Sequence, residues 1–149
     1  MNNIDHRKPH WSFWLIGAGA LIWNLMGSMN FLMQLNPEFV AAMPDTHQAI
    51  IELRPLWATS AFAISVFGGA FGSVLLMLKS SAALFLFFAS LFGTILTFVP
   101  HAHLIGSTIS DPFEIIMMIV MPIAVGIFLL AYARFIKRRY NSTNIHNKS

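Results

Sequence analysis

Four stretches of the chain are long, apolar and uncharged at their centres, and they restrict the possible folds more than any other feature. They cover residues 12–34, 56–78, 81–99 and 113–136. A helix needs about 20 mostly apolar residues to cross the hydrocarbon core of a bilayer. Only 10% of the residues are charged, against roughly 25% in soluble domains. The sequence therefore predicts an all-α fold, with residues 1–149 forming a single transmembrane domain, an integral membrane four-helix bundle.

The basic residues are distributed unevenly between the two sides of the predicted membrane. Eight of the nine Lys and Arg residues lie on the side that holds both termini, and the ninth, Arg54, lies on the other side. Short loops rich in Lys and Arg stay in the cytoplasm, so we expect both termini to be cytoplasmic. This distribution also accounts for the net charge of +3 without a nucleic-acid partner.

Several classes of enzyme are excluded by what the sequence lacks. It contains no cysteine, which excludes a disulfide scaffold and any thiol-dependent catalyst. It also contains no G-x-S-x-G, H-E-x-x-H, Walker A or glycine-rich dinucleotide motif. We therefore expect a non-enzymatic protein that uses no cofactor.

The connection of residues 35–55 carries the signals of a short helix. Pro44 and Pro55 bracket this helix, and Asp45 is suited to cap its N-terminus. We expect a helix over about residues 46–54 that lies at the outer membrane interface. Pro122 lies inside the last apolar stretch and is expected to kink that helix.

The first apolar stretch has two unlike sides. At 100° per residue, its amides and small residues gather on one arc, and its larger apolar residues, such as Leu25 and Met29, lie opposite. Buried amides are costly in hydrocarbon, so the polar arc should face protein. We therefore expect a polar cleft beside the first two helices, and we assign to it the following residues: Trp23, Asn24, Asn30, Gln34 and Trp57. The alternative is that these amides only hydrogen-bond between helices.

The second apolar stretch carries small residues at helical spacing. Such residues let helix backbones approach closely and gain dispersion contacts. We assign helix packing to Gly27, Ser65, Gly68, Gly69 and Gly72. The third stretch continues this pattern with a stripe formed by Ser90, Thr94 and Thr97.

Polar and titratable residues collect on the predicted outer side. This outer rim consists of His47, Glu52, Arg54, His101, His103 and Glu114. The two histidines of the H-x-H could bind zinc or copper, but the pattern is weak and we assign no metal. Arg54 could anchor an anionic ligand, with Glu52 or Glu114 as its expected partner. The third interpretation is a solvated polar rim.

The pattern of residues 21–34 and 56–78 resembles a known family. Trp23-Asn24 is followed by Gly27, Gln34 closes the helix, and Phe67-Gly68-Gly69 is followed by Gly72. In these elements the chain is similar to small four-helix bacterial inner-membrane proteins, mostly uncharacterised and sometimes labelled sugar transporter. The resemblance covers roughly the first 95 residues. It implies a multi-pass protein of the bacterial inner (cytoplasmic) membrane.

These features lead to two main functional hypotheses. The first is a membrane protein that binds or passes a small molecule or lipid through the polar cleft, with transport requiring a homo-oligomer. The alternative is an accessory or assembly subunit, which docks a larger membrane protein through the small-residue face of the second helix. A membrane enzyme or metal sensor built on the outer histidines is a third hypothesis. In each case the lipid bilayer surrounds the protein.

Overall fold

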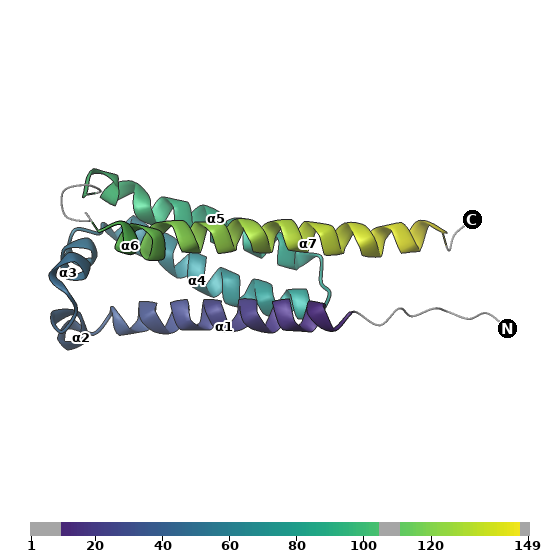
Figure 1. Ribbon diagram of the computed structural model, residues 1–149, viewed down its shortest axis with the longest axis horizontal. Coiled ribbons are helices and arrows are strands. Elements are labelled where there is room, and N and C mark those ends of the chain that lie inside the picture. Colours follow the sequence, from purple (N-terminus) through teal and green to yellow (C-terminus); the bar gives the residue numbers. More distant parts are fainter. Residues whose placement is uncertain (1–9, 105–110, 147–149) are drawn as a thin grey trace.

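The described part of the protein is helical almost throughout and contains no β-strand. A computed structural model of the chain describes residues 10–104 and 111–146 (Figure 1). The helices are α1 (Trp11–Met33), α2 (Pro37–Ala41), α3 (Asp45–Glu52), α4 (Leu56–Met77), α5 (Ala82–Phe98), a 3-10 helix (Val99–Leu104), α6 (Pro112–Ile115), a π-helical turn (Ile116–Val120) and α7 (Met121–His146). The all-α prediction is confirmed for these residues.

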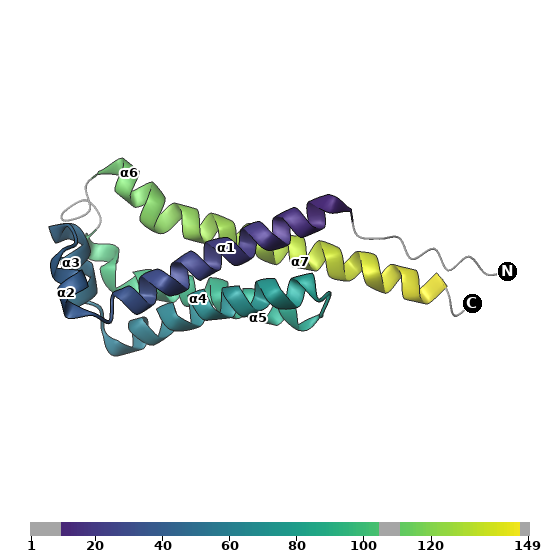
Figure 2. The same ribbon diagram turned by 90° about the horizontal axis from the view of Figure 1, so that it is seen from below.

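The long helices run side by side along one axis of the molecule (Figures 1 and 2). Among the described residues, α1, α4 and the segment Pro112–Arg138 are long and apolar enough to cross a membrane, and α5 is a shorter apolar helix. The beginning of α1 and the end of α7 lie at one end of the molecule, and α2, α3 and α6 lie at the other end (Figure 1). We call the latter the α3 end.

Local sequence signals explain where the shorter elements begin and end. Asn36 accepts a hydrogen bond from the Glu38 amide at 2.9 Å and caps α2, a helix that the sequence analysis missed. Lys79 has a φ of 58° in the turn between α4 and α5. In this turn the Ser80 amide donates to the Leu75 carbonyl at 2.9 Å, closing the end of α4 as a Schellman motif.

The last helix differs from its prediction at two places. It continues to His146, ten residues beyond the predicted end at 136, because a change in hydropathy marks the end of an apolar stretch and not the end of a helix. The irregularity expected at Pro122 takes the form of the π-helical turn Ile116–Val120. Proline has no amide hydrogen and its ring crowds the preceding turn, and a wider turn accommodates both effects.

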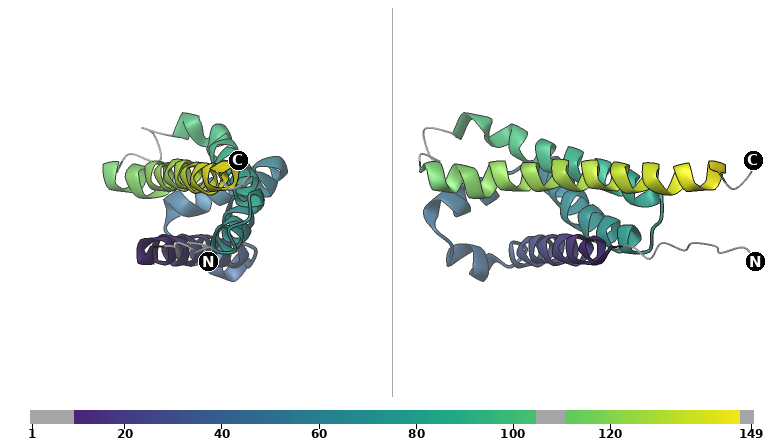
Figure 3. Two further views of the ribbon diagram at one scale, coloured as in Figure 1. Left: turned by 90° about the vertical axis from the view of Figure 1, so that its right-hand side faces the viewer. Right: turned by 45° about the vertical axis from the view of Figure 1, so that its right-hand side comes forward.

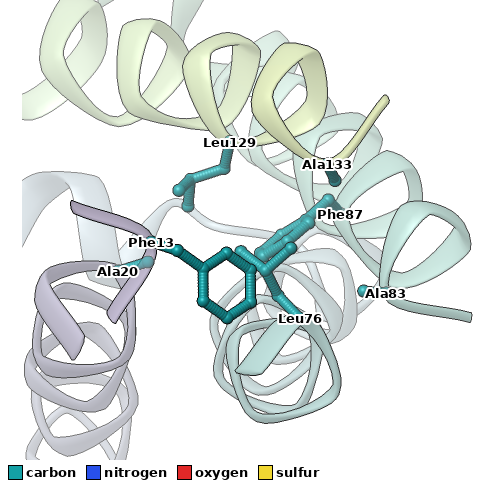
Figure 4. Close-up of a cluster of buried hydrophobic side chains, with 7 residues drawn as sticks. All are labelled: Phe13, Ala20, Leu76, Ala83, Phe87, Leu129 and Ala133. Atoms are coloured by element: carbon teal, nitrogen blue, oxygen red, sulfur yellow. The ribbon is translucent and has the colours of Figure 1, made fainter. Parts of the chain in front are cut away.

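A compact apolar core closes the end opposite to the α3 end. Its buried side chains come from all four long helices and surround Phe13 (Figure 4). Its two largest side chains, Phe13 and Phe87, are 3% and 2% exposed. The cluster consists of Phe13, Ala20, Leu76, Ala83, Phe87, Leu129 and Ala133. It ties α1 and α7 together at this end of the molecule.

Small residues bring α4 and α5 into close contact. A Cβ on Gly93 would lie 2.7 Å from the Ala61 carbonyl oxygen and 3.1 Å from the Ser65 amide nitrogen. Beside this contact, the hydroxyls of Ser65 and Thr94 are 2.6 Å apart, and Ser90 Oγ donates to the Ser65 carbonyl at 2.6 Å. The packing role of Ser65 agrees with the prediction, whereas Gly93 was missed.

The other glycines assigned to packing have unequal roles. A Cβ on Gly69 would overlap the side-chain oxygen of Asn24 on α1, and one on Gly27 would lie 3.1 Å from Val66 Cγ1. A Cβ on Gly72 would lie 3.1 Å from the Phe87 ring. A Cβ on Gly68 would only reach ordinary contact, 3.6 Å from the nearest atom. Gly68 therefore lies in the contact between α4 and α5, but this contact leaves room for a Cβ.

Candidate functional site

A cavity of about 400 Å³ lies between the core and the α3 end. Phe87 and Leu129 belong both to its lining and to the apolar core, so they form its floor. Helices α1, α4, α5 and α7, with α3 and the π-helical turn, supply most of the remaining lining residues. Cavities that bind small ligands have volumes of about 300–1,000 Å³ and mostly apolar linings. The cavity is therefore large enough to hold a small molecule.

The cavity opens sideways between α1 and the π-helical turn. The most exposed apolar side chains in its lining are Met26 of α1, 66% exposed, and Met117 of the turn, 48% exposed. Trp23 and Asn30 of α1 also line the cavity and are exposed. Figures 1 and 3 show α1 and α7 lying apart, and the core joins them at the opposite end. The opening is therefore bordered mainly by apolar side chains.

Arg54 supplies a cationic group to the cavity. This residue lies in the short connection between α3 and α4, and its Nη2 donates to Gln34 Oε1 at 2.8 Å. Its guanidinium carbon lies 5.2 Å from the centroid of the Phe62 ring, where a cation is attracted to the aromatic face. Its Nε is buried and finds no hydrogen-bond partner among the residues that the structure describes. Burial lowers the pKa of Arg54 because desolvation disfavours the charged form.

The prediction that Glu52 or Glu114 is the partner of Arg54 is wrong. Among the described residues, the guanidinium forms its hydrogen bond with the Gln34 amide, at the C-terminal cap of α1. Glu52 is exposed at the end of α3, Glu114 lies in α6, and neither carboxylate lines the cavity. The connection of residues 35–55 returns to the C-terminal end of α1, where Arg54 bonds Gln34 instead.

The structure brings most of the predicted cleft residues to the cavity. Trp23, Asn24, Asn30 and Gln34 all line it. Asn24 is buried, and its Nδ2 donates to the Ala20 carbonyl at 2.8 Å. The side-chain amide of Asn24 thus uses one of its N–H donors within α1. Asn30 also lines the cavity, but its side chain is exposed.

Trp57 does not belong to the cavity. Its side chain is 50% exposed, and it is not among the residues that line the cavity. Trp57 precedes the lining residue Phe62 by five positions, which places it about 140° around α4 from Phe62 at 100° per residue. Its assignment to the cleft is therefore corrected.

The residues of the predicted outer rim are only partly brought together. His47 of α3 lines the same cavity as Arg54, and its Nδ1 is buried with no hydrogen-bond partner in the described part of the chain. The backbone of His101 and His103 belongs to the 3-10 helix, but their side chains lie outside the described part of the protein. Across the ranges that are described, no three His, Asp or Glu side chains are grouped so that they could hold a metal ion.

Several lining residues were not assigned to the cleft by the sequence analysis. Ser90, Thr94 and Thr97 form the polar stripe recognised on the third stretch, but they were interpreted only as packing residues. Their hydroxyls are largely used inside the protein. Thr94 Oγ1 donates to the Ser90 carbonyl at 2.9 Å and Thr97 Oγ1 to the Gly93 carbonyl at 2.8 Å. The apolar wall, which includes Met118 and Val125, had no distinguishing sequence signal.

The chain matches no protein-family model, no curated protein and no solved structure. The resemblance to small bacterial inner-membrane proteins therefore stays a prediction, and the function has to be inferred from the cavity.

Proposed function

We propose that this chain is a non-enzymatic, multi-pass protein of the bacterial inner membrane that binds a small lipid-like molecule in the cavity. The observation that carries the proposal is the 400 Å³ cavity with its sideways opening. In a bilayer this opening faces the acyl chains, so an apolar molecule reaches the cavity without entering water. The amides and the guanidinium at the α3 end then orient the polar part of the ligand.

The proposal includes four membrane spans with both termini in the cytoplasm. Helix α5 has 17 residues, which corresponds to about 26 Å at about 1.5 Å per residue. This is slightly short of the hydrocarbon thickness of about 30 Å, and the 3-10 helix that follows α5 extends the segment. The distribution of basic residues supports an external α3 end.

Cysteine labelling tests this orientation, because the chain has no cysteine of its own. Asp45 and Lys137 are both exposed and lie towards opposite ends of the molecule. We expect a membrane-impermeant maleimide to label Asp45→Cys in cells with a permeabilised outer membrane. Lys137→Cys should react only after the inner membrane is also opened. The reverse pattern would contradict the proposed orientation. External labelling of both sites would place Asp45 and Lys137 on the same side of the membrane, which contradicts the total of four spans.

The alternative, an accessory subunit docked through the small-residue face of the second helix, is less favoured. Ala61, Ser65, Gly69 and Ser73 form that face, and all of them are buried within this chain. A larger membrane protein or a second copy of the chain could instead use the last helix, because almost none of the most apolar window of Pro112–Arg138 is buried. The bilayer itself would cover the same surface equally well.

Filling the cavity should weaken ligand binding. The probe is a stearic acid methyl ester brominated at mid-chain, which quenches tryptophan fluorescence on contact. The readout is Trp23, in a background in which the exposed Trp11, Trp14 and Trp57 are replaced by phenylalanine. We expect saturable quenching of Trp23 in detergent, and we expect Val125→Phe, which adds a ring at the cavity wall, to weaken binding at least about tenfold, or about 1.4 kcal/mol.

Val120→Phe is the matched control for this experiment. Val120 lies in the π-helical turn, is half exposed and does not line the cavity. The same substitution should therefore leave the quenching curve unchanged. The proposal fails if quenching rises linearly with the probe in all variants, since that result would indicate only partitioning into the micelle.

A further inference from the structure

We infer that the ligand is a single-chain amphiphile whose anionic head group, a carboxylate, is bound by Arg54 at the α3 end of the cavity. This inference rests on the proposed function and adds the chemical class of the ligand. It places the head group beside Gln34 and His47 and the apolar chain against the floor formed by Phe87 and Leu129.

The first observation is an uncompensated charge. Arg54 is the one Lys or Arg among the described residues that line the cavity, and no Asp or Glu is among them. A buried charge is costly unless an opposite charge accompanies it. Arginine also stays protonated in proteins, so this cost cannot be avoided by losing the proton. A bound anion would supply the missing counter-charge.

The second observation is a set of unused polar atoms. A guanidinium has five N–H donors, and among the described residues Arg54 uses Nη2 for Gln34 while its buried Nε has no partner. The buried Nδ1 of His47 also has no partner. Buried polar atoms are normally hydrogen-bonded, and hydrogen bonds from a guanidinium to a carboxylate are among the strongest in proteins. The pattern indicates a missing acceptor.

The third observation is that the described lining of the cavity combines a single cation with a mostly apolar wall, which limits the charge and shape of the ligand. One arginine balances one negative charge, which a carboxylate carries, whereas a phosphate monoester would leave excess negative charge in an apolar cavity. The remaining wall is built from apolar side chains, including Val66, Met118 and Val125. These surfaces suit an aliphatic chain, and the apolar opening at Met26 and Met117 lets that chain enter from the bilayer.

The test compares two probes that differ only in head-group charge, mid-chain-brominated stearic acid and its methyl ester. Both are titrated against the Trp23 reporter background at a pH at which the acid is ionised. We expect the acid to bind about tenfold more tightly than the ester, or about 1.4 kcal/mol. Arg54→Gln should remove this preference, because only the acid loses a charge-assisted hydrogen bond.

Two further variants complete the design. Arg134→Gln removes an exposed cation on α7 that is not among the lining residues, and it should leave the preference for the acid unchanged. Arg54→Lys keeps the positive charge but loses the planar, bidentate donor geometry of the guanidinium. It should therefore retain part of the preference for the acid over the ester, and it serves as the test if Arg54→Gln fails to fold.

The outcomes separate this inference from the proposed function. Equal binding of acid and ester, with both weakened by Val125→Phe, would overturn the anionic head group and leave binding in the cavity supported. A preference for the acid that survives Arg54→Gln and Arg54→Lys unchanged would also overturn it. If neither probe gives saturable quenching, the proposed function itself is refuted.

Discussion

Replacing Phe87 with alanine is expected to lower the free energy of unfolding by about 3 kcal/mol, the lower end of the range found for Phe→Ala changes in soluble cores. The Phe87 side chain is 2% exposed and joins α5 to the core at the floor of the cavity. Its removal joins a new void to an existing cavity, and the lost dispersion contacts cannot be recovered. We choose the lower end of the range because lipid is as apolar as the core, so helix association has no hydrophobic driving force.

The matched control is Phe88→Ala, one position further along α5. Phe88 is 55% exposed, so its ring is mostly in contact with the surroundings and not with protein. We expect a change in unfolding free energy below about 0.5 kcal/mol, as is usual for surface positions. Reversible unfolding in sodium dodecyl sulfate measures both variants. Equal effects of the two substitutions would show that Phe87 is not a central packing residue.

The second large effect is expected for Gly93→Ala, which should destabilise the protein by about 1–3 kcal/mol, as overpacking does in other cores. The new Cβ would lie 2.7 Å from the Ala61 carbonyl oxygen and 3.1 Å from the Ser65 amide nitrogen. Both atoms belong to the backbone of α4, so they cannot move away by a change of rotamer. The helices α4 and α5 would have to separate, and this would lengthen the bond between the Ser65 and Thr94 hydroxyls.

Gly68→Ala provides the comparison. Gly68 lies in the same contact between α4 and α5, but its Cβ would reach only ordinary contact, 3.6 Å from the Leu86 carbonyl oxygen. Alanine also favours the helical backbone over glycine by roughly 0.5–1 kcal/mol. We therefore expect Gly68→Ala to be neutral or stabilising in the same unfolding assay. Destabilisation by Gly68→Ala as large as that by Gly93→Ala would contradict the geometry of this contact.

Apolar stretches in the sequence were sufficient to predict where the long helices lie. The stretch 12–34 became α1, Trp11–Met33, and the stretch 56–78 became α4, Leu56–Met77. Hydropathy did not reveal the real end of α7, because residues 137–146 contain polar side chains but no glycine or proline to stop a helix. The cap of α2 at Asn36 does have a local sequence signal, Asn36-Pro37-Glu38.

The candidate site was predictable only in part. The helical periodicity of α1 predicted that Asn24 turns inward, and Asn24 is buried. Periodicity compares residues within one helix, so it could not relate Arg54 to a partner 20 residues away. It also could not recognise the wall of Met118 and Val125, because an apolar residue that lines a cavity has the same local pattern as one that faces lipid.

By itself, the sequence determined the helical class of this protein, the apolar length of its segments and the inward-facing arc of α1. These properties follow from local composition and from the 3.6-residue period of the helix. Only the tertiary structure decided that the helices close around Phe87 at one end and enclose a cavity at the other. It also decided that Arg54 lies in that cavity beside Gln34, with no carboxylate among the described residues that line it. The physical reason is that such features depend on which helices touch, and the close approaches at Gly69 and Gly93 set this between segments distant in the sequence.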